Sequence, residues 1–233
     1  YIFRYMRRAA DHSVDIIHFP EVALPGAVGL DFSSFEDLDW NQLQRHTNKI
    51  QELARRLKIW VVLGSYDWVS AHAKPTNSLH IIADTGDIVA NYDKQRLFGK
   101  ESERCSAGNK PVTLTIKGVR CGFLICYDSC FPSLYQGYRR MGIQLLFHSY
   151  YNARNEGGAN SLDDLMVAQL RTRAADHGLW ISASNSSARH SRMAACVARP
   201  DGHVRTTKRH MAGFAVGAFP GEPLGWTYDN GEG

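Results

Sequence analysis

The chain has 233 residues, of which 44% are hydrophobic, and a formal net charge of +4. This length and apolar content can bury a sizeable core, and they predict one domain over residues 1–233. The basic residues are scattered, which argues against a nucleic-acid partner. We find no signal peptide and no apolar run long enough to cross a membrane, so we expect a cytoplasmic protein without a membrane partner.

Two helices and four strands are predicted in the first part of the chain, one of the strands being the short apolar run that stops at Pro20. Apolar residues recur at helical spacing over residues 3–13 and 41–57, and short apolar runs predict strands at 59–65, 78–83 and 88–92. A Gly-containing turn joins the last two strands, as is typical of a hairpin. Strands that alternate with helices in this way indicate an α/β fold.

The second part of the chain continues the alternation. A buried strand ends at Ile125 and is followed by two helix–strand pairs and a hairpin turn. In chain order these are a helix at 131–141, a strand at 144–148, a helix at 163–177, a strand at 179–184 and a turn at 199–202. This order also favours α/β architecture.

A cysteine, Cys126, stands at the end of the buried strand. The residues before it are apolar or glycine, and Tyr127, Asp128 and Ser129 after it indicate a sharp turn. A thiol in this position is fixed by the sheet and faces the carboxyl end of the strand, where open α/β sheets bind ligands. Free cysteine is more often inert core packing, so this segment alone leaves Cys126 as either a nucleophile or a packing residue.

Two charged residues occupy similar places at the ends of other strands. Glu21 follows the apolar run that ends at Pro20, and Lys94 follows the strand at 88–92. Either residue alone fits a solvated side chain. A carboxylate, an ammonium and a thiol at three strand ends together predict acyl transfer at a carbon–nitrogen bond. The carboxylate takes the thiol proton, the thiolate attacks the carbonyl or nitrile carbon, and the ammonium stabilises the negative charge.

These segments resemble three motifs of the carbon-nitrogen hydrolase (nitrilase) superfamily. Phe-Pro-Glu21, Tyr-Asp-Lys94-Gln-Arg-Leu-Phe-Gly and Cys126-Tyr-Asp-Ser-Cys-Phe-Pro are similar to its Glu, Lys and Cys boxes, in the same order, and the resemblance extends over about residues 3–218. It implies that Glu21 is the general base, Lys94 the electrophilic stabiliser and Cys126 the nucleophile. The backbone N–H of Tyr127 would complete the oxyanion hole.

The resemblance also implies a second catalytic glutamate in the loop after Lys94. Members of the family often carry it seven residues ahead of the glycine in a Phe-x-Pro-Gly stretch, and Glu101 has this spacing from Gly108. Cys105 stands where that stretch has phenylalanine, and an alanine replaces its proline. Glu103 is therefore a rival for the role of Glu101.

The fold and assembly implied by the resemblance are those of the nitrilase type. We expect an α/β four-layer α-β-β-α sandwich that forms a homodimer, or a higher homo-oligomer, through the helices flanking the cysteine. The family usually opens with a strand ahead of its first helix, whereas this sequence begins inside the helical pattern. Either the sequence as given lacks this strand or the sheet lacks an edge strand, and we expect the former because the loss of a strand would expose backbone groups and apolar core.

No metal or cofactor is expected. The five cysteines are an odd number, and they form neither a CxxC pair nor a His/Cys cluster at zinc spacing. Substrate contacts are expected from Tyr127 and from Tyr150 and Asn152, which follow the strand next to that of Cys126. Asn185 is a weaker candidate, and His148 is expected to be structural.

The sequence thus predicts a thiol-dependent amidohydrolase that cleaves a non-peptide C–N bond of a small amide through a Cys126 thioester. The Cys-Tyr-Asp motif resembles the amidase-like branches, which favours an amide over a nitrile as the substrate. A nitrilase or carbamoyl-amide hydrolase, an amide acyltransferase and a non-catalytic binding subunit remain alternatives. A binding subunit would not need to retain Glu21, Lys94 and Cys126 together.

Overall fold

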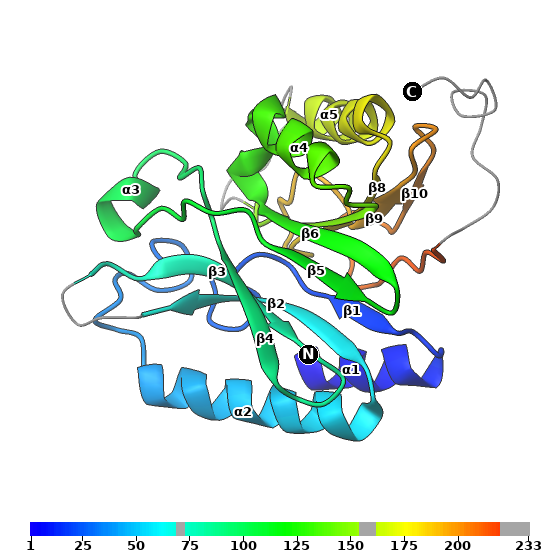
Figure 1. Cartoon of the computed structure of the whole chain (residues 1–233). Helices are drawn as coiled ribbons and strands as arrows, with labels where there is room; N and C mark the ends of the chain where they lie inside the picture. Colours follow the sequence, from blue (N-terminus) through cyan, green and yellow to red (C-terminus); the bar gives the residue numbers. More distant parts are fainter. Residues whose placement is uncertain (69–72, 154–161, 220–233) are drawn as a thin grey trace. The chain divides into compact units, whose positions relative to one another are not determined.

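The computed structural model describes residues 1–68, 73–153 and 162–219 (Figure 1). The chain divides into two compact units, Tyr1–Val112 (unit 1) and Thr113–Gly233 (unit 2). Each unit contains one β-sheet with helices beside it. The prediction of a single domain stays a prediction.

Unit 1 contains a four-stranded sheet in the order β1-β2-β3-β4. β1 and β2 are parallel, and the other neighbours are antiparallel. Its elements in chain order are α1 (Ile2–Asp11), β1 (Ile16–His18), α2 (Trp40–Leu57), β2 (Trp60–Asp67), β3 (Thr76–Ile82), β4 (Ile88–Asp93) and the short α3 (Glu101–Arg104). β1 is an edge strand among the described residues, and the expectation of a further strand before α1 stays a prediction.

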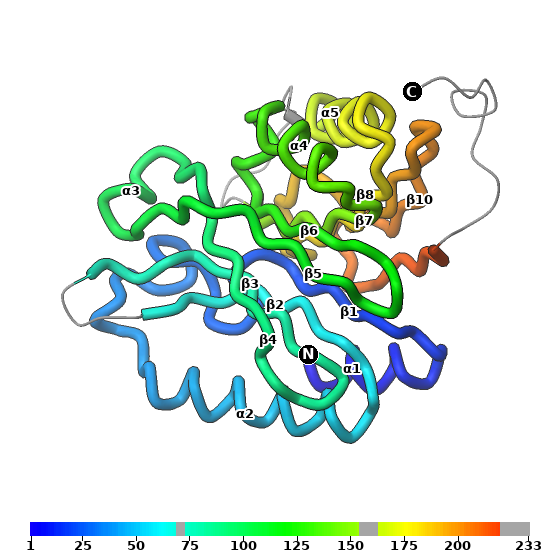
Figure 2. The backbone as a smooth tube through the Cα atoms, viewed as in Figure 1, coloured from blue at the N-terminus to red at the C-terminus, as the bar shows by residue number. Residues whose placement is uncertain are grey.

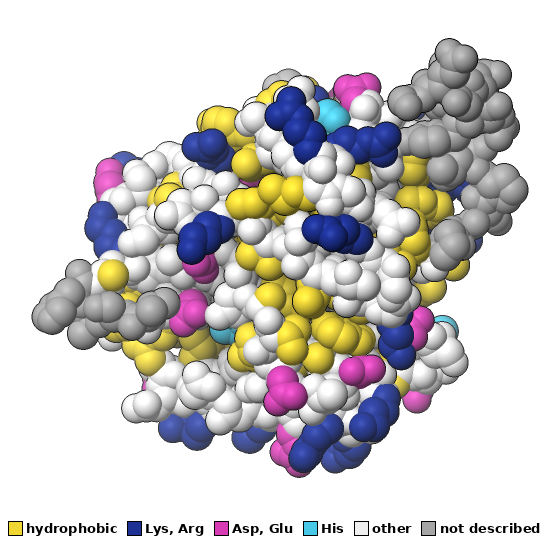
Figure 3. Space-filling model, viewed as in Figure 1, with side chains coloured by type: hydrophobic (Ala, Val, Ile, Leu, Met, Phe, Trp, Pro, Cys, Tyr) yellow, Lys and Arg dark blue, Asp and Glu magenta, His cyan; other side chains and the backbone are white. Residues whose placement is uncertain are grey.

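The core of unit 1 lies between its sheet and the helices α1 and α2 (Figure 1). Ile50 and Leu53 of α2 and Met6 of α1 pack with Val61 and Leu63 of β2, and all five are almost fully buried. Asp39 begins α2 by accepting a hydrogen bond from the Gln42 backbone N–H, as N-cap residues do. The outer face of α2 carries exposed arginines and a lysine, which form part of the basic lower edge in Figure 3. The predicted amphipathic helix is therefore present.

A glycine in β2 lets the loop after β1 lie directly on the sheet. A Cβ atom at Gly64 would stand 2.0 Å from the Pro20 carbonyl oxygen and 2.6 Å from the Val22 nitrogen. The Gly64 carbonyl also accepts a hydrogen bond from the Leu24 N–H, and Val22 takes a left-handed φ of 48°. Glu21 is held inside this close contact, so its position depends on the missing side chain of Gly64.

Unit 2 contains a six-stranded sheet in the order β10-β9-β8-β7-β6-β5. Helices α4 and α5 lie beside this sheet, and Figure 2 traces β6, β7 and β8 as neighbours. Its elements are β5 (Thr113–Ile116), β6 (Val119–Ile125), the 3-10 helix η1 (Cys126–Cys130), α4 (Pro132–Arg140), β7 (Leu145–Ser149), α5 (Leu162–His177), β8 (Trp180–Ser184), β9 (Cys196–Ala198) and β10 (Val204–Thr206).

The three central strands of unit 2 are parallel and in register. Ile125 of β6 pairs with Ser149 of β7, and Ser149 pairs with Ser184 of β8. The next residue of each strand, namely Cys126, Tyr150 and Asn185, therefore lies at the same edge of the sheet. This is the edge at which parallel sheets present functional residues.

The predicted elements agree with the structure in type and order. Each helix and strand expected in the two parts of the chain is present, with ends that differ by a few residues, and the turn at 199–202 connects β9 to β10. The turn after Cys126 is a 3-10 helix. Among the described residues, every helix is too short or too polar to traverse a lipid bilayer.

Candidate active site

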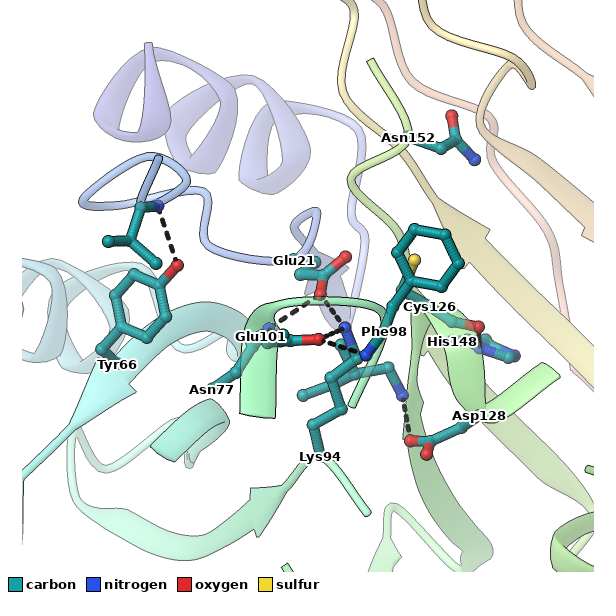
Figure 4. A network of polar contacts seen from close by, with 12 residues as sticks. Glu21, Tyr66, Asn77, Lys94, Phe98, Glu101, Cys126, Asp128, His148 and Asn152 are labelled. Atoms are coloured by element: carbon teal, nitrogen blue, oxygen red, sulfur yellow. Dashed lines mark hydrogen bonds and ion pairs between the residues drawn. The ribbon is translucent and has the colours of Figure 1, made fainter. Parts of the chain in front are cut away.

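Unit 1 holds a buried ion cluster built from Glu21 and Lys94. The Lys94 ammonium Nζ lies 2.8 Å from Glu21 Oε1 and 2.8 Å from Glu101 Oε2, and Figure 4 shows it between the two carboxylates. The side chains of Lys94 and Glu21 are only 3% and 6% exposed. Buried charges require partners of opposite sign, and each of these carboxylates has one in Lys94.

The ends of two strands explain why Lys94 reaches this position. β4 ends at Asp93, which pairs with Ser78 of β3, so Lys94 lies beside Asn77 at the start of β3. The Lys94 backbone N–H donates to the Asn77 carbonyl at 2.8 Å. The predicted position of Lys94 at a strand end is therefore correct, and the antiparallel register directs it to the side of Asn77.

Asn77 is a member of the cluster that the sequence did not indicate. Its Nδ2 donates to Glu21 Oε1 and to Glu101 Oε1, both at 2.8 Å. Asn77 and Lys94 thus each bridge the same two carboxylates and close a ring of four side chains (Figure 4). A buried polar residue in a strand requires hydrogen-bond partners, but β3 contains several polar residues, so this signal alone does not single out Asn77.

The two candidate glutamates in the loop after Lys94 differ in their contacts. Glu101 opens α3, pairs with Lys94 and accepts a hydrogen bond from the Phe98 N–H at 2.9 Å, whereas Glu103 is exposed. The structure therefore brings Glu101, and not Glu103, to the ammonium. Cys105 lies close enough for the charge of Glu101 to add to the effect of burial, which raises the pKa of the Cys105 thiol to about 12.

In unit 2, Cys126 lies at the turn between β6 and η1. It has a left-handed φ of 43°, which is uncommon for a residue with a side chain and marks a locally strained turn. Asp128 is fully buried, and its Oδ2 accepts a hydrogen bond from the Ile125 N–H at 3.0 Å (Figure 4). Cys126 itself is half-buried. The turn therefore holds the thiol at the strand end without burying it completely.

The other cysteines differ from Cys126 in exposure. Cys105, Cys121 and Cys196 are buried, and burial raises the pKa of each thiol to about 12. A raised pKa disfavours the thiolate, which is the nucleophilic form of cysteine, so these three sites favour packing over catalysis. Cys130 is exposed, so it is the thiol that competes with Cys126 for small reagents.

The predicted substrate contacts have polar partners within unit 2. Tyr150 is buried with its hydroxyl 3.1 Å from His148 Nδ1, and burial raises its pKa, with the nearby charge of Cys126 as a smaller cause. Asn152 Oδ1 accepts hydrogen bonds from Asn185 Nδ2 at 2.7 Å and from the Arg192 N–H at 3.0 Å. The structure thus places both asparagines in a hydrogen-bonded pair near the carboxyl edge of the sheet.

Tyr127, the residue after Cys126, packs its ring edge-to-face on Phe131, with the ring centroids 5.4 Å apart. Over the described ranges, no group of three or more His, Cys, Asp or Glu side chains is arranged to hold a metal ion.

Comparison with known proteins identifies the family. The family model described as carbon-nitrogen hydrolase matches residues 2–209. The chain is 31% identical over 200 residues to the nitrilase and fragile histidine triad fusion protein NitFhit of Caenorhabditis elegans, covering 80% of this chain and 43% of that protein. It is 26% identical over 154 residues to the deaminated glutathione amidase of Yersinia enterocolitica, covering 61% and 52%.

A solved structure supports the same assignment at the level of the fold. The NitN amidase of Nesterenkonia sp. AN1 superposes with a TM-score of 0.75 at 21% identity, covering 87% of this chain and 78% of that chain. The predicted α/β fold of the nitrilase type is thereby confirmed. The protein belongs to the carbon-nitrogen hydrolase family. The chain spans about half the length of the first curated relatives that it matches.

Proposed function

We propose that this protein hydrolyses the C–N bond of a small amide, with Cys126 as the nucleophile and the Glu21–Lys94–Glu101 cluster as its proton-transfer and electrostatic machinery. The observation that supports this most is the buried ring in which one ammonium is 2.8 Å from each of two carboxylates. A structural ion pair would need only one of them. Membership of the carbon-nitrogen hydrolase family supports a further partner for this cluster, and the residue that we propose is Cys126.

The first half-reaction forms a thioester. Glu21 takes the proton of the Cys126 thiol, and the thiolate adds to the amide carbon. The oxygen of the tetrahedral intermediate carries the negative charge and is stabilised by the Lys94 ammonium and the Tyr127 N–H. The C–N bond then breaks, and the protonated Glu21 returns its proton to the leaving nitrogen, which departs as ammonia or an amine.

The second half-reaction restores the enzyme. Glu21, again ionised, takes a proton from water as the water oxygen adds to the thioester carbon. The second tetrahedral intermediate uses the same two donors, Lys94 and the Tyr127 N–H. Its collapse breaks the C–S bond, gives the carboxylic acid product and returns the proton to the Cys126 sulfur.

Glu101, the second carboxylate beside Lys94, also has a role in this cycle. When Glu21 is protonated, it no longer neutralises Lys94. Glu101 Oε2 lies 2.8 Å from the same ammonium and keeps it paired at that stage. Because a buried ammonium without a partner loses its proton readily, Glu101 preserves the charge that stabilises the oxyanion. This explains why two acids surround one lysine.

The substrate class that we propose is a small aliphatic amide or an ω-amide. One relative is named for an amidase activity on deaminated glutathione, and the solved structure of similar fold is that of an amidase. The Cys-Tyr-Asp sequence at Cys126 points in the same direction.

Ammonia release over a panel of small amides, ω-amides and nitriles tests the proposal. We expect release from amides by the wild type and none from the Cys126→Ala variant, with Cys130→Ala as the matched control because Cys130 is exposed and four residues away. Turnover of nitriles but not of amides would show that the protein is a nitrilase and would contradict the proposed amidase activity. Amide turnover that survives Cys126→Ala would refute the thioester mechanism.

We also propose that the protein acts as a homodimer formed through α4 and α5, the helices that follow the cysteine. Light scattering after size-exclusion chromatography tests this, with a mass near twice the 26.1 kDa of the chain as the expected result and a monomer as the contrary one. The cytoplasmic setting stays a prediction of the sequence.

A further inference from the structure

His148 is a buried histidine that the proposed mechanism does not use. It lies in β7, next to the strand that carries Cys126, and is fully buried. Its Nε2 lies 3.3 Å from the backbone carbonyl oxygen of Cys126. Its Nδ1 faces two hydroxyls, that of Tyr135 at 3.0 Å and that of Tyr150 at 3.1 Å.

The partners of His148 fix which nitrogen carries the hydrogen. A carbonyl oxygen can only accept, so the contact with Cys126 requires a hydrogen on Nε2. The single lone pair of Nδ1 then accepts from one of the two nearby hydroxyls, that of Tyr135 or that of Tyr150, and burial raises the pKa of both tyrosines, which keeps their hydroxyl hydrogens in place. The ring is also stacked on Tyr150, with centroids 4.2 Å apart. His148 therefore points a fixed N–H at the Cys126 carbonyl.

The Cys126 carbonyl and the Tyr127 N–H belong to one peptide group. The peptide is planar and trans, so its C=O and N–H point in opposite directions and move together. Holding the carbonyl therefore fixes the direction of the Tyr127 N–H. A hydrogen bond to the carbonyl also polarises the peptide and makes its N–H a stronger donor. The left-handed φ of Cys126 makes such support necessary, because that conformation is unfavourable for a residue with a side chain.

We propose that His148 is a positioning residue for the oxyanion hole: its Nε2–H holds the Cys126 carbonyl and so aims the Tyr127 N–H at the developing oxyanion. This inference rests on the function proposed above and adds a residue to the same site. His148 acts through the peptide group that joins Cys126 to Tyr127.

The test separates oxyanion stabilisation from folding and from thiol reactivity. His148→Leu removes the donor at similar volume, and His148→Gln retains an amide N–H. Tyr138→Phe is the matched control, because the fully buried Tyr138 hydroxyl donates at 2.7 Å to the Phe123 carbonyl, three residues earlier in the same chain segment. For each variant we would measure kcat and KM for an amide and the rate of Cys126 alkylation by iodoacetamide, which forms no oxyanion.

We expect His148→Leu to lower kcat by roughly 10- to 100-fold with little change in KM. The reason is that the Tyr127 N–H, which His148 aims, stabilises the oxyanion and therefore acts mainly in the transition state. Its alkylation rate should stay near that of the wild type, and His148→Gln should recover most of the lost kcat. Tyr138→Phe should lose stability and keep its kcat. Equal falls in kcat and alkylation for His148→Leu, a wild-type kcat for that variant, or an equal loss of kcat in Tyr138→Phe would overturn the proposal.

A second measurement covers the case in which His148→Leu does not fold. Nitrogen-15 NMR of the wild-type imidazole reports its tautomer directly, and we expect the hydrogen on Nε2. An imidazole that carries its hydrogen only on Nδ1 would overturn this inference and leave the proposed function intact. A wild type that turns over no amide would overturn the proposed function, and the oxyanion role of His148 with it.

Discussion

The two units hold their candidate residues by different physical means. In unit 1, Glu21, Lys94 and Glu101 are fixed by charge, since each carboxylate is 2.8 Å from the same buried ammonium. In unit 2, Cys126 is fixed by the backbone, through a left-handed turn at the end of β6. We therefore expect the cluster to be sensitive to the loss of a charge and to a shift of the loops that carry the charges, and the turn to be sensitive to the loss of the hydrogen bonds that hold its peptides.

The largest effect on the charged side of this comparison is expected from Lys94→Ala. The variant removes the proposed oxyanion donor, and the loss of such a donor typically costs roughly 100- to 1,000-fold in turnover. It also leaves two buried carboxylates without the ammonium that pairs with them. Amide turnover by the variant measures the effect, with the exposed Lys49→Ala as the control. Retention of more than about a tenth of wild-type turnover would be incompatible with the role assigned to Lys94.

Gly64→Ala tests whether the loop that carries Glu21 must lie on β2. The added Cβ would stand 2.0 Å from the Pro20 carbonyl oxygen, so the loop must move. We expect turnover to fall by about tenfold or more, because a displacement of about 1 Å in a catalytic group can cost about 100-fold. Gly137→Ala in α4 is the control, since a Cβ there meets nothing within 4 Å. Equal turnover in the two variants would show that the close contact does not position Glu21.

Asn77→Ala breaks the ring of unit 1 without changing its charge. It removes two hydrogen bonds to carboxylates, so we expect a loss of roughly 1–3 kcal/mol in the free energy of unfolding together with a several-fold fall in kcat. Chemical denaturation and steady-state kinetics provide the two values. Asn91→Ala is the control, because Asn91 is exposed and also donates to a carboxylate, that of Asp67. Equal stability and equal kcat in the two variants would show that the hydrogen bonds of Asn77 do not hold Glu21 and Glu101 in place.

The smallest effect on turnover is expected from two buried histidines, which act on the pH dependence of stability and are not among the proposed catalytic residues. Burial lowers the pKa of His18 in β1 to about 3, and it also lowers the pKa of His80 in β3. The unfolded chain binds protons on these histidines near pH 6.5, whereas the folded chain does not, so stability falls as the pH drops from 6.5 towards 3. Urea denaturation across this range should show that the free energy of unfolding depends less on pH in His18→Gln than in the wild type. An unchanged dependence in that variant would exclude His18 as a cause.

The sequence predicted the residues whose position is set by the end of a strand. Glu21, Lys94 and Cys126 each follow an apolar run, and the parallel register of β6 and β7 confirms that Tyr150 shares an edge with Cys126. The contact partners of these residues could not be read from the runs. They depend on which strands are neighbours and in which register, and this information is absent from the local sequence.

Asn77 and His148 show where the sequence pattern was insufficient. Both are polar residues inside buried strands, and such residues must have hydrogen-bond partners. The pattern alone does not say whether those partners are structural or functional. The antiparallel pairing of β3 with β4 places Asn77 at Lys94, and the parallel pairing of β6 with β7 places His148 at the Cys126 carbonyl.

The function proposed above requires that Cys126, Glu21 and Lys94 take part in one reaction. Intact-mass detection of an acyl adduct, after rapid mixing with an amide and acid quenching, tests it most directly. We predict an adduct on Cys126 in the wild type, none in Cys126→Ala, and at least about a tenfold slower appearance in Lys94→Ala. An adduct that forms at the wild-type rate in Lys94→Ala, or on a cysteine other than Cys126, would contradict the account.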